Sequence, residues 1–177
     1  MSKIISVSKS NTHGFSKSVV DSIILIEDEG VAGDAHRGRT VKHRSRVKKD
    51  PSKPNLRQVH LIHNELLEEL RDKGFRVTPG TLGENITTTD IDLLSLPRNT
   101  ILSIGDQVEI ELTGLRNPCS QLDHYQKGLT AAVLERDEEG NIKRKAGVMG
   151  IIVKGGEVRK DDTIQIKLPE PPHYPLE

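Results

Sequence analysis

The stretch Gln107-Val-Glu-Ile-Glu-Leu-Thr113 alternates apolar and polar side chains without a break. Because residues two apart on a strand share one face, it predicts a β-strand over residues 107–113. Its apolar side chains face the core, and its two glutamates face water. Residues 163–168 repeat the alternation, which predicts a second strand with Ile164, Ile166 and Leu168 facing inward.

Apolar runs and helical stripes extend the pattern on either side of this stretch. Residues 23–26 and 148–153 are continuous apolar runs, which are typical of strands covered on both faces. The spacing of apolar residues predicts short helices over about 65–73, ending before Gly74, and over roughly 129–137. Many short strands with two short helices predict a mainly β fold, built as a compact barrel with helical crossovers.

Length and composition narrow the classes of function. Residues 1–177 contain no internal repeat and no linker, so a single domain is expected. Basic and acidic residues number 26 each and only 2% of residues are aromatic, which makes nucleic-acid binding unlikely on composition. One cysteine excludes a disulfide within the chain and indicates a reducing, cytoplasmic location. No secretory signal and no apolar run approaching the ~20 residues of a membrane span are present, so no membrane partner is expected.

Two segments are predicted to be irregular. Residues 37–57 hold nine Lys or Arg residues against one acid, and the tail over residues 169–177 is rich in proline. The basic stretch is open to three interpretations: a solvated loop, a flap that binds phosphate-like anions, or a nucleic-acid contact, the last being the least favoured. Like charges and prolines predict that it is mobile when no ligand is bound.

The only cysteine, Cys119, follows the first predicted strand in the sequence Leu-Arg-Asn-Pro-Cys. Pro118 cannot donate a ladder hydrogen bond, so the strand is expected to end there and to present Cys119 on a loop. A guanidinium at Arg116 favours thiolate over thiol. A thiolate can attack sulfur or carbon, or bind a soft metal. The alternative is an inert, buried cysteine that packs as a small apolar residue.

Two glycine-bracketed turns carry further polar side chains. Residues 33–38 place Asp34 and His36 two apart, where both could face a ligand, although a tight turn capped by Asp34 is the simpler interpretation. Residues 80–87 offer the amide of Asn85 in a loop that could hold a phosphate or a heterocycle, or that simply leads into a strand. We expect both turns to converge with Cys119 on one pocket.

Taken together, these segments resemble the MOSC domain family, named for the C-terminal domain of molybdenum cofactor sulfurases. The resemblance covers roughly residues 30–168, nearly the whole chain. Five short motifs carry it in order: Gly33-Asp-x-His-x-Gly38, Gly83-Glu-Asn-Ile-Thr87, Ile104-Gly-Asp106, Leu115-Arg-x-Pro-Cys119, and Ala146-Gly-Val leading to Gly156.

The resemblance implies a β-barrel-like domain associated with the molybdenum cofactor (molybdopterin). In the family the cysteine is proposed to carry sulfur as a persulfide or to ligate molybdenum, and some members reduce N-hydroxylated compounds. Carried over, Cys119 is the sulfur carrier or the metal ligand. Asn85, Arg116 and Asn117 would contact the pterin phosphate or the surroundings of the dithiolene. Asp34 and His36 match a family motif to which no role is assigned.

The chain also departs from larger members of the family. No aminotransferase-like desulfurase domain precedes the motifs, so sulfur transfer would need a donor such as a cysteine desulfurase. No ferredoxin-type cysteines are present, so a reductase activity would take its electrons from a partner. The alternative function is a non-catalytic binding or adaptor domain in which Cys119 is structural.

Overall fold

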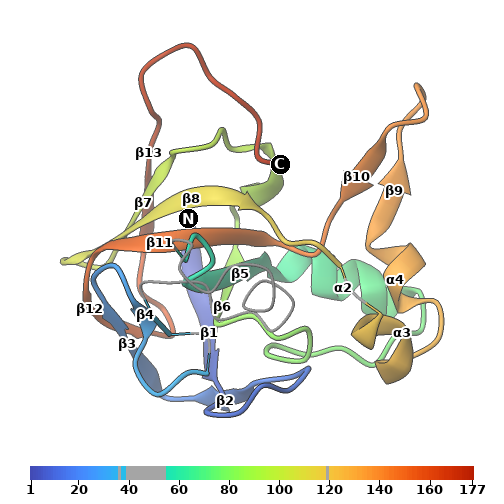
Figure 1. Ribbon diagram of the computed structural model, residues 1–177, viewed down its shortest axis with the longest axis horizontal. Helices are drawn as coiled ribbons and strands as arrows, with labels where there is room; N and C mark the ends of the chain where they lie inside the picture. Colours follow the sequence, from blue (N-terminus) through green and yellow to red (C-terminus); the bar gives the residue numbers. More distant parts are fainter. Residues whose placement is uncertain (36, 39–54, 119) are drawn as a thin grey trace.

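The computed structural model describes residues 1–35, 37–38, 55–118 and 120–177. His36, Cys119 and most of the basic stretch 37–57 therefore lie outside the described residues. The prediction that this stretch is mobile concerns those residues and stays a prediction. The described chain is built around one large sheet (Figure 1). Its strands are, in order across the sheet, β13 (Ile164–Lys167), β7 (Ile101–Ile104), β8 (Val108–Leu115), β11 (Val148–Lys154), β5 (Val59–His63), β6 (Ile86–Thr89), β1 (Lys3–Lys9) and β2 (Ser18–Val20).

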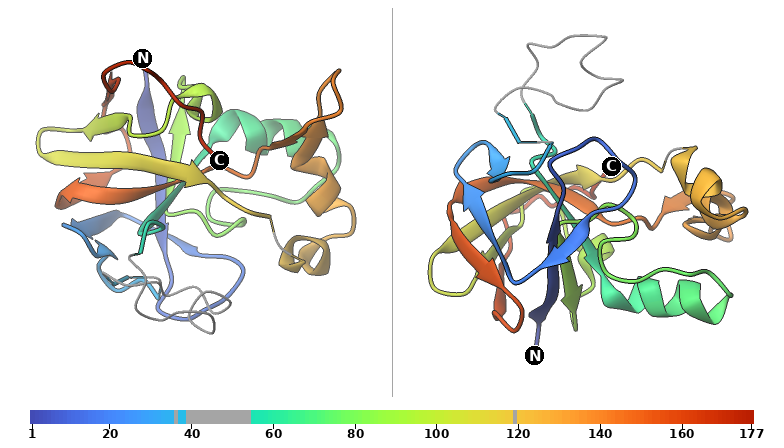
Figure 2. Two further views of the ribbon diagram at one scale, coloured as in Figure 1. Left: turned by 45° about the horizontal axis from the view of Figure 1, so that its top comes forward. Right: turned by 90° about the horizontal axis from the view of Figure 1, so that it is seen from below.

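Smaller elements surround this sheet. A three-stranded sheet has the order β12-β3-β4, and a two-stranded hairpin pairs β10 with β9. The bounds of these strands are β12 (Gly156–Arg159), β3 (Ser22–Ile26), β4 (Gly30–Val31), β10 (Ile142–Arg144) and β9 (Leu134–Arg136). The helices are α2 (Asn64–Asp72), α3 (Gln121–Tyr125), α4 (Leu129–Ala132) and the short 3-10 turn η1 (Leu93–Ser95). Figures 1 and 2 show the hairpin of β9 and β10 projecting from the body of the protein beyond α4.

The prediction of a mainly β fold with a few short helices is confirmed, and the large sheet is not closed as a barrel. The eight-stranded sheet is open, with β13 and β2 as its edges. One bridge between Lys3 and Thr163 brings β1 next to the segment that leads into β13, without a continuous ladder between the two strands. Closure depends on stagger and tilt summed over the whole sheet, which no local pattern in the sequence specifies.

The register around β5 positions the site described below. Strand β11 pairs with residues 59–61 of β5, whereas β6 runs parallel to β5 and pairs with residues 61–63. Both neighbours therefore begin beside the middle of β5, at Leu61. On the β6 side, His60 faces the loop that enters β6 instead of a paired strand residue.

Helix α2 forms close to its predicted range of 65–73. Its buried side is made by Leu66, Leu67 and Leu70, and it ends where Gly74 takes a positive φ of 94°. The helix predicted over 129–137 is only partly correct, because α4 stops at Ala132 and the chain continues as β9. The reason is the turn that follows: the Asp137 carboxylate accepts hydrogen bonds from the amides of Glu139 and Asn141, which favours a hairpin over a longer helix.

Some predicted burial is also wrong. Ile166 and Leu168 were expected to face inward, but both are exposed: Ile166 lies on the edge strand β13, and Leu168 lies beyond its end. Ile24 is exposed as well, so residues 23–26 are covered on one face only. By contrast, β11 is buried along most of its length, in agreement with its continuous apolar run.

Two apolar clusters hold these layers together. The larger lies between the sheets, and the smaller packs α2, α3 and α4 against the end of the large sheet. The tail returns to the large sheet: the Leu115 amide donates to the Glu177 carbonyl over 2.9 Å, and Leu176 is buried. Among the described residues, no helix has the length and apolar character needed to span a membrane.

Candidate functional site

Asp34 forms a buried ion pair directly after β4. Each of its carboxylate oxygens lies 2.8 Å from Nζ of Lys17, and the two side chains are only 1% and 5% exposed. The backbone amide of Ser10 donates to the same carboxylate over 3.0 Å. Burial lowers the pKa of Lys17, and the charge and hydrogen bonds of Asp34 oppose this shift. The pair thus links three segments that are distant in the sequence.

Asn85 joins this ion pair to the large sheet. Its backbone amide donates to the carbonyl of His60 over 2.8 Å, and its side-chain oxygen accepts the His60 amide over 3.1 Å. Asn85 thereby satisfies both backbone groups of His60 on the side of β5 that faces β6, where β6 has not yet begun to pair. Its side-chain amide donates to the Ser8 carbonyl over 3.2 Å and to Asp34 over 3.4 Å. Asp34 and Asn85 are therefore in contact, as we expected of their two turns.

Two glycines of the Asn85 loop, Gly80 and Gly83, allow this loop to approach another segment of the chain closely. Gly80 and Gly83 have φ values of 89° and 90°. A Cβ atom at Gly80 would lie 2.4 Å from the Lys17 carbonyl oxygen, and one at Gly83 would lie 2.8 Å from that of Phe15. Because only glycine fits such contacts, the loop packs tightly against the segment that carries Lys17.

Glu84 and the partly buried Arg116 complete this polar group. The guanidinium of Arg116 donates to the carbonyl of Leu82, and its backbone amide donates to Gly147 over 3.0 Å. Glu84 is fully buried, and neither of its carboxyl oxygens has a well-aligned hydrogen-bond donor. Burial raises the pKa of Glu84 to about 7, although Arg116 and nearby backbone amides of the same loop oppose the shift.

His60 is the remaining buried titratable side chain here. Its Nε2 lies 2.8 Å from the carbonyl oxygen of Ala146, so this nitrogen carries the proton and donates. Burial lowers the pKa of His60 well below its ordinary value, and the charge of Arg116 acts in the same direction. The ring is therefore neutral at physiological pH. We refer to Lys17, Asp34, His60, Glu84, Asn85 and Arg116 as the Asp34 cluster.

The model of the MOSC domain matches residues 36–165 of the chain. That range is more than half of the 177 residues. The chain belongs to the MOSC domain family. The matched range includes the segments that carry Asn85 and Arg116.

Several solved structures share the fold of this chain. The YuaD protein from Bacillus subtilis superposes with a TM-score of 0.75 at 23% identity, over 96% of this chain and 98% of that one. YiiM from Geobacillus stearothermophilus gives 0.63 at 14% identity, over 94% and 75%. YiiM from Escherichia coli gives 0.63 at 17% identity, over 98% and 73%. The TM-scores show a shared fold. Comparison with curated protein sequences gives no match.

The residues predicted for the site fall into three groups in this MOSC domain. Asp34, Asn85 and Arg116 belong to the Asp34 cluster. Asn117 is exposed, and its side chain accepts a hydrogen bond from Arg144. His36 and Cys119 lie outside the described residues. No group of three or more His, Cys, Asp or Glu side chains suited to a metal ion occurs in the part of the chain that the structure describes.

Lys17 was missed by reasoning from the sequence. It stands in a polar stretch without a recognisable motif, and only the folded chain brings it to Asp34. His60 contacts Ala146, which is 86 residues away in the sequence. Glu84 stands beside Asn85 in the same loop. Its missing donors could not be foreseen, because they depend on how the loop folds around it.

The Glu84 carboxyl is expected to make stability depend on pH. Its pKa is 4.5 in an unstructured chain and about 7 here, so the folded chain binds the proton more tightly. Stability should fall by about 3 kcal/mol as the pH rises through that window, which spans the two pKa values. Glu84→Gln removes this loss. It should match the wild type at low pH and be about 3 kcal/mol more stable near pH 8.

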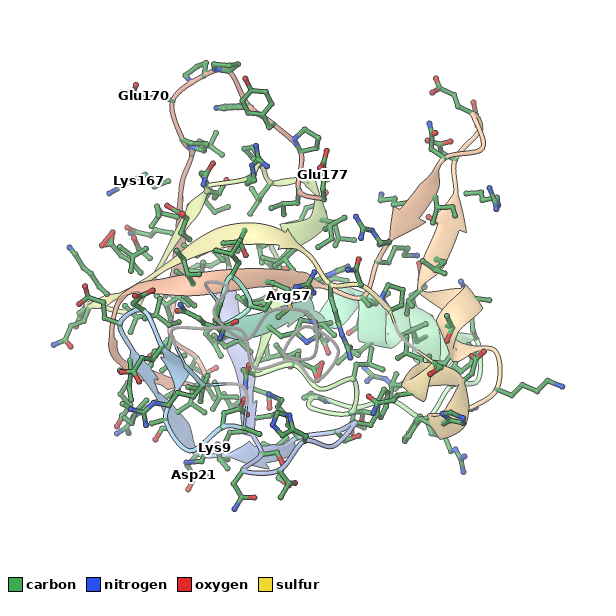
Figure 3. All side chains as sticks on the ribbon, in the orientation of Figure 1. Lys9, Asp21, Arg57, Lys167, Glu170 and Glu177 are labelled. Carbon is green, nitrogen blue, oxygen red and sulfur yellow. The ribbon has the colours of Figure 1, made fainter. Side chains whose placement is uncertain are left out.

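Urea unfolding at several pH values measures this difference directly. A matched control is Glu170→Gln in the exposed tail loop, where the side chain is labelled in Figure 3. The control should follow the wild type at every pH. Equal stabilities of the wild type and Glu84→Gln at every pH would mean that the Glu84 carboxyl is not shielded from water in the folded protein.

Proposed function

We propose that this MOSC domain binds the molybdenum cofactor or carries sulfur, with Cys119 as the metal ligand or the persulfide carrier. One observation supports this proposal above the others. Three family motifs from separate parts of the chain supply Asp34, Asn85 and Arg116 to a single buried cluster. Cys119 follows Arg116 by three residues in the sequence.

The chemistry of the cluster fits an anionic group. Arg116 lies close enough to lower the pKa values of Lys17 and His60. When Glu84 is protonated, the two positive charges of Lys17 and Arg116 exceed the single negative charge of Asp34. A pterin phosphate, a dithiolene and a persulfide are all anions. Arg116, Asn117 and Asn85 would hold the cofactor from this side, and Cys119 would supply the soft sulfur that molybdenum prefers.

In the metal version, the cofactor would supply the redox centre and the Cys119 thiolate would be the residue that holds its molybdenum. A partner reductase would supply the electrons. Reduction of an N-hydroxylated compound to its amine consumes two electrons and two protons and releases water. The residues of the Asp34 cluster would orient the cofactor, and the burial of this cluster would keep its charged groups away from water.

In the carrier version, the Cys119 thiolate attacks the terminal sulfur of a donor persulfide, such as that of a cysteine desulfurase. An S–S bond forms at Cys119 while the donor cysteine leaves as a thiolate, so no external oxidant is needed. Arg116 would stabilise the anionic product. The competing function is an adaptor domain in which Cys119 has no chemical role.

Metal and sulfur analysis of the same preparation separates these functions. The protein is expressed in cells with an intact cofactor pathway, purified gently, and assayed for molybdenum and for sulfane sulfur. Near-stoichiometric molybdenum supports the metal version, and sulfane sulfur without molybdenum supports the carrier version. Protein from cells that cannot make the cofactor is the control. The absence of both elements from the cofactor-replete protein would favour the adaptor.

A further inference from the structure

The hairpin of β9 and β10 projects from the body of the protein, and its two faces differ in composition (Figures 1 and 2). Its register places Ile142 directly opposite Arg136. Residues paired directly across an antiparallel ladder share a face, as do residues two apart on one strand. One face of the hairpin therefore presents four side chains: Leu134, Arg136, Ile142 and Arg144. We call this the Arg136 face.

Both guanidinium groups of the Arg136 face donate to neutral oxygens. Arg136 donates to the carbonyl of Gly140 over 2.9 Å, and Arg144 donates to the side chain of Asn117. These contacts hold the two arginines in place, but a neutral acceptor does not compensate a positive charge. The Arg136 face is therefore basic.

The acidic residues of the hairpin lie elsewhere. Glu135 is on the opposite face, where its carboxylate lies 3.5 Å from Nζ of Lys145. The same Nζ lies 2.6 Å from the carboxylate of Glu69 on α2, so the opposite face is tied to the body by ion pairs. The other acids, residues 137–139, stand in the turn at the far end of the hairpin. The separation of charge between the two faces thus follows from the register.

Ile142 lies between the two arginines and is 57% exposed. A single exposed isoleucine is ordinary on a protein surface. An apolar side chain flanked by arginines, however, has the composition of a protein–protein contact, in which an apolar centre is surrounded by polar groups and arginine is enriched. The complementary surface carries an apolar residue between carboxylates.

The contact between Arg144 and Asn117 connects this face with the site described above. Asn117 follows Arg116 of the Asp34 cluster directly in the sequence, at the end of β8. A protein seated on the Arg136 face would therefore lie beside the segment that the proposed function assigns to the cofactor, and the hairpin would direct it there.

We propose that the Arg136 face docks an acidic electron-donor protein. The proposal rests on the metal version of the proposed function, in which a partner supplies the electrons. The face is small and dominated by charge, as is typical of the transient contacts of electron-transfer proteins. An electron can cross a gap between partners, whereas a sulfur donor must bring its sulfur into contact with the accepting thiolate. A hairpin that projects from the body suits the first requirement better.

Electrostatic attraction between the two proteins would act mainly on the rate of their encounter. Two successive dockings of a reduced one-electron carrier would deliver the two electrons that reduction of an N-hydroxylated compound consumes, and each carrier would leave oxidised. The solvent supplies the two protons. Short-lived contacts are an advantage here, because each carrier has to leave before the next one docks.

NMR titration of the isotope-labelled full-length chain with an oxidised plant-type ferredoxin, an acidic one-electron carrier, tests the proposal. The amide signals of residues 134–136 and 142–144 should shift or broaden before those of other surfaces. Raising the ionic strength from about 20 mM to about 200 mM should weaken binding by about tenfold, because exposed charges are screened at the higher value.

Arg136→Gln should weaken the binding of ferredoxin by about fivefold, the upper range for one exposed ion pair. Ile142→Ser in the same chain should weaken it further. The matched control is Lys167→Gln on the exposed edge strand β13, where the side chain is labelled in Figure 3. It removes the same charge from another surface and should bind as the wild type does. Urea unfolding shows whether each variant is folded.

Several results would overturn the proposal. These are the absence of binding at low ionic strength, signal changes confined to other surfaces, or equal weakening by Arg136→Gln and Lys167→Gln. Changes at the hairpin that depend on the concentration of the chain alone, without ferredoxin, would assign the face to a second copy instead. Failure of the proposed function appears separately, as missing molybdenum and missing sulfane sulfur in protein from cofactor-replete cells, which this titration does not involve.

Discussion

Asp34→Asn is expected to lower the free energy of unfolding by about 3–5 kcal/mol, the range found when one partner of a buried ion pair is removed. Lys17 would remain almost fully buried but would lose the carboxylate that now lies 2.8 Å from it. Asparagine has nearly the same shape, so the hydrogen bond from the Ser10 amide can survive. The loss would therefore report the unpaired charge of Lys17, and guanidinium unfolding near neutral pH measures it.

Two comparisons make this result interpretable. Combining Asp34→Asn with Lys17→Met removes both charges and should restore a large part of the stability, because no buried charge is left unpaired. Glu29→Gln breaks the exposed pair with Arg37, whose side chains are 30% and 40% exposed, and should cost less than about 1 kcal/mol. If Asp34→Asn costs no more than Glu29→Gln, the ion pair is not buried in solution.

The ion pair also explains why the site could be predicted only in part. Asp34 and Asn85 stand in short glycine-bracketed motifs, so their polar side chains were visible in the sequence, and the structure brings them to within 3.4 Å of each other. The residues that hold Asp34 and Asn85 in place do not stand in motifs that can be recognised in the sequence. Lys17 reaches Asp34 because the segment between β1 and β2 folds over the loop at Gly80 and Gly83, and a contact of this kind is decided by the whole sheet.

In the fold as well, some elements could be predicted from local sequence patterns, whereas others depend on how the whole chain packs. The alternating stretch that ends at Thr113 lies in β8, whose apolar residues are buried in turn as predicted, and α2 forms on its leucine stripe. Side-chain periodicity is enough for both, because each buries one face against the core. Periodicity could not show that β13 is an edge strand, which leaves Ile166 exposed, or that the large sheet remains open.

The second large effect is expected at Cys119, where Cys119→Ser should abolish bound molybdenum or transferable sulfur. Serine is nearly the same size as cysteine, so the variant should fold and unfold as the wild type does. Its hydroxyl is a hard, weakly acidic oxygen that binds molybdenum poorly, and it cannot form a persulfide. Ser120→Ala is the matched control, because Ser120 is the exposed neighbour and its side chain makes no capping hydrogen bond.

The decisive measurement is the molybdenum and sulfane-sulfur content per polypeptide of the wild type, Cys119→Ser and Ser120→Ala, expressed side by side with an intact cofactor pathway. Molybdenum or sulfane sulfur near stoichiometry in the wild type and in Ser120→Ala, with almost none in Cys119→Ser, is the result we predict. Equal molybdenum in all three proteins, with no sulfane sulfur on any of them, would contradict the proposed role of Cys119 and identify it as a structural residue.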